Sequence, residues 1–161
     1  MSLQIDIQRA CSASTADDED IKHWIAAALA HRQPDAEVSV RLVTEEEMTR
    51  LNHQYRGRDS STNVLSFPAD LPADLEHPLL GDIVICTAVV AREAVEQGKG
   101  EQQHWAHMLV HGSLHLLGYD HIDAQEAELM ESLETTILQS LGYPCPYTGK
   151  PGVQQCGARA K

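Results

Sequence analysis

The chain has 161 residues, of which 42% are hydrophobic and 22% charged, a composition typical of one globular domain. Its formal net charge of -12 argues against a large nucleic-acid-binding surface but leaves room for a local basic contact. The sequence has neither an apolar run long enough to cross a bilayer nor the basic and apolar regions of a secretory signal, so we expect a cytoplasmic protein.

The N-terminal part of the chain predicts a strand, a helix and a second strand. Residues 3–8 and 37–43 alternate apolar and polar side chains, which is typical of strands with one buried face. Between them, apolar residues recur at helical spacing over residues 21–29.

The next segment predicts a helix, a loop and a short strand. Thr44 with Glu47 forms a capping-box pattern that opens a helix running toward Tyr55. The sequence RGRDSST, residues 56–62, is typical of a loop, and NVLSF, residues 63–67, of a strand.

The C-terminal part predicts one strand and three helices. The apolar run over residues 81–87 indicates a buried central strand, and the Pro- and Asp-rich residues 69–80 before it a loop. Helices are expected over residues 88–97 and 101–117, and a capping pattern at Asp123 begins the last one. None of the four cysteines belongs to a CxxC pair, which favours reduced, non-catalytic thiols.

These elements predict an α/β (α+β) fold: a small mixed sheet of about four strands packed with about five helices. We expect one domain over residues 1–147, with a metal site at the end of one helix. The tail, residues 148–161, lacks hydrophobic periodicity and is predicted to be disordered.

The metal site is predicted from HGSLHLLGYDH, residues 111–121. His111 and His115 are four residues apart and therefore share one face of a helix. Gly118 can end that helix, so that the chain turns back and His121 completes three sides of a tetrahedron. Three protein ligands and an open fourth position are typical of catalytic zinc sites. We therefore expect one Zn²⁺ per chain, although imidazole also suits other divalent metals.

The spacing of the histidines leaves a peptidase as an alternative. Metzincin metallopeptidases share this frame but carry Glu after the first histidine as their general base, where this chain has Gly112. His107 lies on nearly the same helical face and is either a rival ligand or a residue that orients one. Asp120 is either a hydrogen-bond partner of a ligand imidazole or a turn residue.

The histidine motif, preceded by HWAHMLVH, resembles the signature of the YbeY family of bacterial endoribonucleases. The stretches LNHQYRGRDSSTNVLSFP, LLGDIVIC and EAELMESLETTILQSLGYP are also similar, so the resemblance covers roughly residues 40–145 in detail. It implies a mixed sheet with helices packed around it, a catalytic metal on His111, His115 and His121, and an essential arginine at Arg56.

The resemblance also implies a cellular role. It predicts cleavage of single-stranded RNA, in the maturation of the 3′ end of 16S ribosomal RNA and in ribosome quality control. The expected partners are the ribosomal RNA precursor and the small ribosomal subunit, with ribosomal proteins or a ribosome-associated GTPase; neither DNA nor a membrane is expected. A non-catalytic ribosome assembly factor with a structural zinc is a second alternative.

Phosphodiester hydrolysis gives the predicted residues their roles. A three-histidine metal site lowers the pKa of bound water from 15.7 toward about 7, so a hydroxide forms without a glutamate base. The planar guanidinium of Arg56 can hold two phosphoryl oxygens. Arg58, Asn63 and Ser66 are candidate substrate contacts, the last two with turn and strand roles as equal alternatives. The 2′-OH of the RNA remains a second candidate nucleophile.

Overall fold

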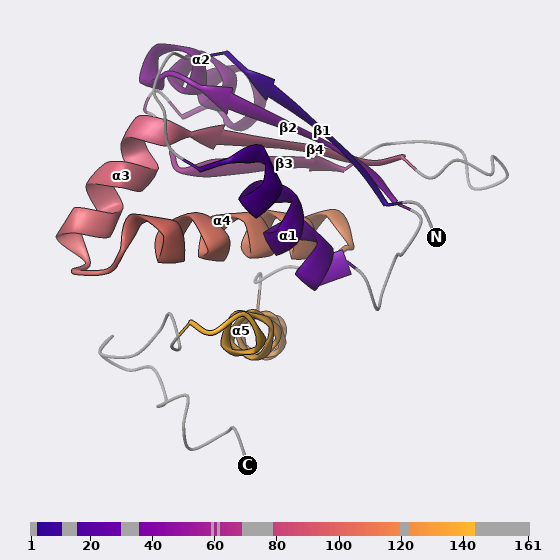
Figure 1. The fold of residues 1–161 in the computed structure, drawn as a ribbon. Helices are drawn as coiled ribbons and strands as arrows, with labels where there is room; N and C mark the ends of the chain where they lie inside the picture. Colours follow the sequence, from indigo (N-terminus) through magenta and orange to yellow (C-terminus); the bar gives the residue numbers. More distant parts are fainter. Residues whose placement is uncertain are drawn as a thin grey trace, which may run out of the picture.

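The computed structural model describes residues 3–10, 16–29, 36–58, 60, 62–68, 79–119 and 123–143. This part of the chain contains four strands and five helices, which confirms the predicted α/β fold (Figure 1). In chain order they are β1 (Gln4–Arg9), α1 (Asp18–Leu29), β2 (Glu37–Val43), α2 (Glu45–Arg56), β3 (Val64–Pro68), β4 (Leu79–Cys86), α3 (Thr87–Glu96), α4 (Glu101–Leu116) and α5 (Ala124–Ser140). The predicted tail lies outside the described residues.

The sheet is mixed and has the strand order β1-β2-β4-β3. Strands β1, β2 and β4 are parallel, and β3 runs antiparallel to β4 at one edge. The predicted central position of the apolar strand is confirmed, since Ile83 and Ile85 of β4 are fully buried. The predicted start of this strand is wrong: β4 begins at Leu79, because that residue already pairs with Glu37 of β2.

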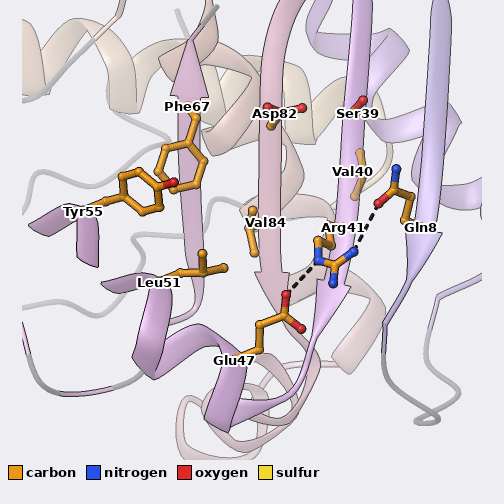
Figure 2. Close-up of a pocket in the computed structure, with 10 residues that line it drawn as sticks. All are labelled: Gln8, Ser39, Val40, Arg41, Glu47, Leu51, Tyr55, Phe67, Asp82 and Val84. Carbon is orange, nitrogen blue, oxygen red and sulfur yellow. Dashed lines mark hydrogen bonds and ion pairs between the residues drawn. The ribbon is translucent and has the colours of Figure 1, made fainter. Parts of the chain in front are cut away.

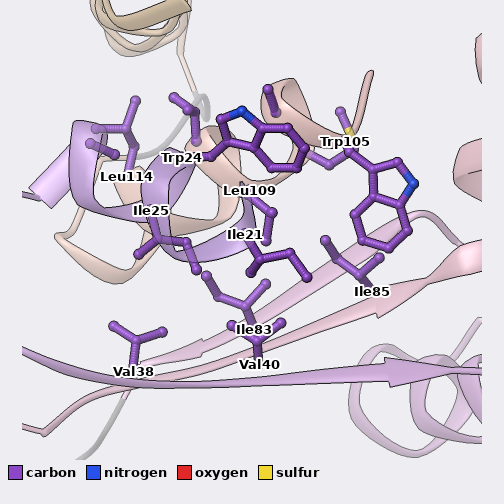
Figure 3. Close-up of a cluster of buried hydrophobic side chains, with 14 of the residues drawn as sticks. Ile21, Trp24, Ile25, Val38, Val40, Ile83, Ile85, Trp105, Leu109 and Leu114 are labelled. Carbon is purple, nitrogen blue, oxygen red and sulfur yellow. The ribbon is translucent and has the colours of Figure 1, made fainter. Parts of the chain in front are cut away.

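The two faces of the sheet are covered unequally. Helices α1 and α4 lie on one face with α5 beyond them, and α2 lies on the other face (Figure 1). The main core fills the space between the sheet and the α1–α4 layer (Figure 3). The predicted inward face of β2 is confirmed, because Val38 and Val40 point into this core. Helix α4, which carries the histidine motif, is therefore held between the sheet and α5.

The two predicted caps fix the starts of α2 and α5. The Thr44 hydroxyl accepts a hydrogen bond from the Glu47 amide at 3.2 Å, and the Asp123 carboxylate accepts one from the Glu126 amide at 2.8 Å. Such caps satisfy amides that have no partner within the helix. Among the described residues, no helix combines the length and apolar character that a membrane span requires.

Candidate active site

A cleft of about 600 Å³ lies between strand β3 and the C-terminal half of helix α4. Its lining includes Arg56 from the end of α2, Asn63 and Ser66 from the β3 segment, and His111 and His115 from α4. Among the described residues that line it, Arg56 has the one full charge and none is acidic. In a chain with a net charge of -12, this cleft is locally suited to an anion.

Arg56 is positioned by the end of helix α2. The predicted loop boundary is wrong by one residue, because Arg56 is the last residue of the helix and the loop starts after it. Gly57 ends the helix at a φ of 69°, a left-handed conformation that favours glycine, and its amide donates to the His53 carbonyl at 3.0 Å. The Arg56 side chain is exposed and makes no hydrogen bond or ion pair with the other described residues. Its guanidinium is therefore available to a ligand in the cleft.

Gly112 lets helix α4 lie close against the sheet. A Cβ atom at this position would stand 3.2 Å from both Ile83 Cγ2 and Ser66 Oγ, tighter than ordinary van der Waals contact. The Ser66 hydroxyl also donates to the Gly112 carbonyl at 3.1 Å. Position 112 thus faces the packed contact with β3 and β4. A glutamate side chain there would have to displace Ile83 and Ser66, so this position is poorly suited to the metallopeptidase base.

His111 and His115 bring their ring nitrogens together on one face of α4. Their Nε2 atoms are 3.1 Å apart, as the spacing of four residues predicts. His111 Nδ1 lies 2.5 Å from the Glu134 carboxylate of helix α5. Because a carboxylate accepts hydrogen bonds, Nδ1 carries the proton and Nε2 of His111 presents its lone pair toward His115.

Glu134 is the functional residue that the sequence analysis missed. Its side chain is fully buried, and besides His111 it accepts a hydrogen bond from His107 Nε2 at 3.0 Å. Burial alone would raise the pKa of Glu134, but the hydrogen bonds from His107 and His111 outweigh it and hold the pKa well below its usual range. Burial lowers the pKa of His107, against the opposing effect of Glu134. Near neutral pH, an ionised carboxylate therefore orients the imidazoles of His107 and His111.

A sequence signal for Glu134 does exist. The buried residues of helix α5 are Met130, Glu134, Ile137 and Leu138, which recur at helical spacing. Glu134 therefore falls in the middle of an apolar stripe, where an acidic residue is rarely found without a partner.

Comparisons with known proteins show the family to which the chain belongs. A family model described as "Endoribonuclease YbeY" matches residues 5–142. The chain belongs to the YbeY family of endoribonucleases. It is 58% identical to the endoribonuclease YbeY of Pseudomonas putida over 146 residues, which cover 90% of this chain and 93% of that protein. It is 57% identical to the endoribonuclease YbeY of Pseudomonas fluorescens, over 90% of this chain and 96% of that protein.

A solved structure supports the fold. The solution structure of TM1509 from Thermotoga maritima is similar to this chain with a TM-score of 0.58 and 26% sequence identity. The similarity covers 94% of this chain and all of that one.

The structure places only some of the residues that the YbeY resemblance implies. Arg56, His111 and His115 line the same cleft. His121 and Asp120 lie outside the described residues, so their roles stay predictions. Within the described ranges, no group of three His, Cys, Asp or Glu side chains is placed to share a metal ion.

The remaining candidates have structural partners. Asn63 and Ser66 line the cleft, but the Asn63 amide donates to Glu93 at 3.0 Å and the Ser66 hydroxyl to Gly112. Arg58 is exposed and is not among the residues that line the cleft. His107 lies next to the site and shares Glu134 with His111.

A second hollow, of about 430 Å³, lies on the face of the sheet that carries α2 (Figure 2). Its arginine, Arg41, donates to Glu47 at 2.8 Å and to Gln8 at 3.2 Å, as the dashed lines show. Asp82 adds a further carboxylate to its lining. Arg41 is therefore engaged within its own hollow and does not extend the basic character of the Arg56 cleft.

Proposed function

We propose that this chain is a metal-dependent endoribonuclease that cuts single-stranded RNA in the cytoplasm. Its substrate is the precursor of 16S ribosomal RNA, whose 3′ end it matures, and it takes part in ribosome quality control. The observation that carries the proposal is the single cleft that joins Arg56 to His111 and His115. Membership of the YbeY family supports the endoribonuclease activity.

The histidines fit a zinc ion as ligands. The Nε2 atoms of His111 and His115 face each other at 3.1 Å, and Glu134 holds His111 in the tautomer that leaves Nε2 unprotonated. His121 is the proposed third ligand. When bound, zinc supplies Lewis acidity and lowers the pKa of a coordinated water toward neutrality.

The protein residues bind and orient the phosphodiester. The Arg56 guanidinium can donate two parallel hydrogen bonds to phosphoryl oxygens and neutralise charge that develops there. None of the described residues that line the cleft is acidic, so the positive charge of Arg56 stays uncompensated there until the substrate enters. Residue 112 is a glycine and cannot act as a base. Removal of a proton from the nucleophile therefore does not depend on a glutamate at that position. This favours a nuclease over the peptidase alternative.

The proposed partners are those that the YbeY resemblance implies, and the charge of the whole chain is compatible with a need for them. With a net charge of -12 and one arginine in the cleft, we expect weak binding to free RNA. The small ribosomal subunit, with its ribosomal proteins or an associated GTPase, would then supply the remaining affinity and the specificity.

The test is cleavage of a single-stranded RNA by the purified protein, after chelation and after zinc is restored. We expect activity to be lost on chelation, regained with zinc, and abolished by His115→Ala or Arg56→Ala. Arg50→Ala is the matched control, because Arg50 is an exposed arginine of the same helix outside the cleft. Equal activity in the wild type and the His115→Ala protein would refute the proposal.

The cellular part is tested separately. In cells that depend on this chain, His115→Ala should leave 16S ribosomal RNA with unprocessed 3′ ends. Mapping of the 3′ ends of the isolated RNA detects them. Normal 3′ ends in that strain would refute the role in maturation while leaving the nuclease activity intact.

A further inference from the structure

The turn that follows Arg56 is fastened to helix α2 by Asn52. This side chain is 1% exposed, and its amide donates to the Ser60 carbonyl at 2.8 Å. The backbone carbonyl of Asn52 also accepts from the backbone amide of Arg58 at 3.4 Å. Asn52 therefore holds the chain on the C-terminal side of Arg56 at two points, from inside the fold.

The far end of the same segment is fastened by Glu93 of helix α3. One oxygen of Glu93, Oε1, accepts from the Asn63 amide at 3.0 Å and lies 2.8 Å from Nε2 of His104. His104 is 2% exposed and belongs to α4, the helix that carries the histidine motif. The other end of Asn63 accepts from the Val64 amide at 2.7 Å. Glu93 thus ties the cleft wall at Asn63 to the helix across the cleft.

From these contacts we infer that Asn52 and Glu93 are positioning residues for Arg56. The inference rests on the proposed function, in which Arg56 binds the scissile phosphate. Arg56 is exposed and has no partner among the described residues, so the backbone that follows it must be ordered by contacts elsewhere. Asn52 fixes the near end of that backbone and Glu93 the far end. Ordering it before substrate arrives reduces the entropy lost on binding.

The assignment changes the role of Asn63. Both ends of its amide are engaged, one by Glu93 and one by the Val64 amide, so it shapes the cleft wall. Glu93 acts on the substrate only through this wall and the turn that follows Arg56.

Three substitutions of Glu93 separate the effect of its side-chain length from the effect of its negative charge. Glu93→Gln keeps an oxygen in place of Oε1 without the charge, Glu93→Asp keeps the charge on a shorter side chain, and Glu93→Ala keeps neither. Glu93 is 26% exposed, so we expect all three proteins to fold. Glu96→Ala is the matched control, because Glu96 is an exposed acid of the same helix.

The measurement is kcat/KM on a single-stranded RNA, in the wild-type and the Arg56→Ala backgrounds. We expect Glu93→Ala and Glu93→Asp to lower it about fivefold, a coupling typical of residues in one network. Glu93→Gln and Glu96→Ala should stay near wild type. In the Arg56→Ala background, Glu93→Ala should cause no further loss. If the Arg56→Ala protein shows no measurable cleavage, the same four proteins are compared by the Kd with which they bind a 2′-O-methyl oligonucleotide, which cannot be cleaved through its 2′ position.

Hydrogen exchange of the amides of Arg58 and Ser60 gives a readout independent of activity. Glu93→Ala and Asn52→Ala should each speed this exchange, and Glu93→Gln should not. An additive loss of kcat/KM in the Arg56→Ala background, or unchanged exchange in Glu93→Ala, overturns the inference. If Arg56→Ala alone leaves kcat/KM unchanged, the phosphate contact of the proposed function fails instead, and the exchange data still decide whether Glu93 orders the turn.

Discussion

Glu134 is the residue whose substitution tests the site most directly. It is fully buried and accepts hydrogen bonds from His107 and His111, so we expect it to contribute both to stability and to the orientation of His111, a proposed metal ligand. Two variants separate the contributions. Glu134→Ala removes the carboxylate, whereas Glu134→Gln keeps its shape but offers only one oxygen to the two imidazoles.

The magnitudes follow from burial. Removing the carboxylate leaves the ring N–H donors of His107 and His111 without an acceptor, which costs about 2–5 kcal/mol in total and for a chain of this size lowers Tm by about 4–20 °C. Losing one hydrogen bond to a charged group costs about 1.5–3 kcal/mol, so Glu134→Gln should lower Tm by about 3–10 °C. Because Glu134 fixes the tautomer of His111, we also expect Glu134→Gln to weaken zinc binding by about 10- to 100-fold.

Thermal unfolding should be measured on metal-free protein, so that lost metal affinity does not enter the Tm. Zinc affinity is then measured by competition with a chromophoric chelator. Glu128→Gln is the control, an exposed acid on the same helix. If Glu134→Gln matched this control in both Tm and zinc affinity, the orienting role of Glu134 would be refuted.

Three further predictions concern packing and protonation. Gly112→Ala should destabilise the fold by about 1–2 kcal/mol in urea unfolding, since overpacking outweighs the gain in helix propensity; Gly100→Ala, which has open space, should not. Burial lowers the pKa of His107, so its contribution to stability is full above about pH 6.5, its unfolded pKa, and is lost as pH falls toward the folded pKa. Urea midpoints should therefore fall between pH 7.5 and 5.5, and a flat profile would contradict a buried neutral His107. Burial raises the pKa of Cys86, so iodoacetamide should label this thiol only after unfolding, as peptide mass spectrometry can show.

Local features were predictable from the sequence because local interactions determine them. The caps at Thr44 and Asp123 require only a side chain and an amide three residues later. Likewise the pairing of His111 with His115 follows from the pitch of a helix. The one-residue error at the end of α2 also has a local cause, since Arg56 and Gly57 together form the helix end and the pattern does not say which is helical.

Contacts between distant elements could not be predicted in the same way. Arg56 and His111 line one cleft, although the first ends helix α2 on one face of the sheet and the second lies on helix α4 on the other face. No periodicity encodes that placement, and the family resemblance supplied the link between the two residues. Glu134 was missed for a related reason: its partners lie on α4, and a helical stripe shows that a residue is buried without showing what it contacts.

The positions of the carboxylates explain how a peptidase-like histidine frame can belong to a nuclease. A base must accept a proton from the nucleophile, so it must reach the cleft and have a pKa near the working pH. Position 112 faces the sheet, where a side chain would crowd Ile83 and Ser66. Glu134 is close to the histidines, but it is fully buried, both of its oxygens are occupied, and its pKa is held far below neutrality. Neither position is placed to supply a base, so the carboxylate next to this frame orients imidazoles, and in the proposed function the charge at the substrate comes from Arg56.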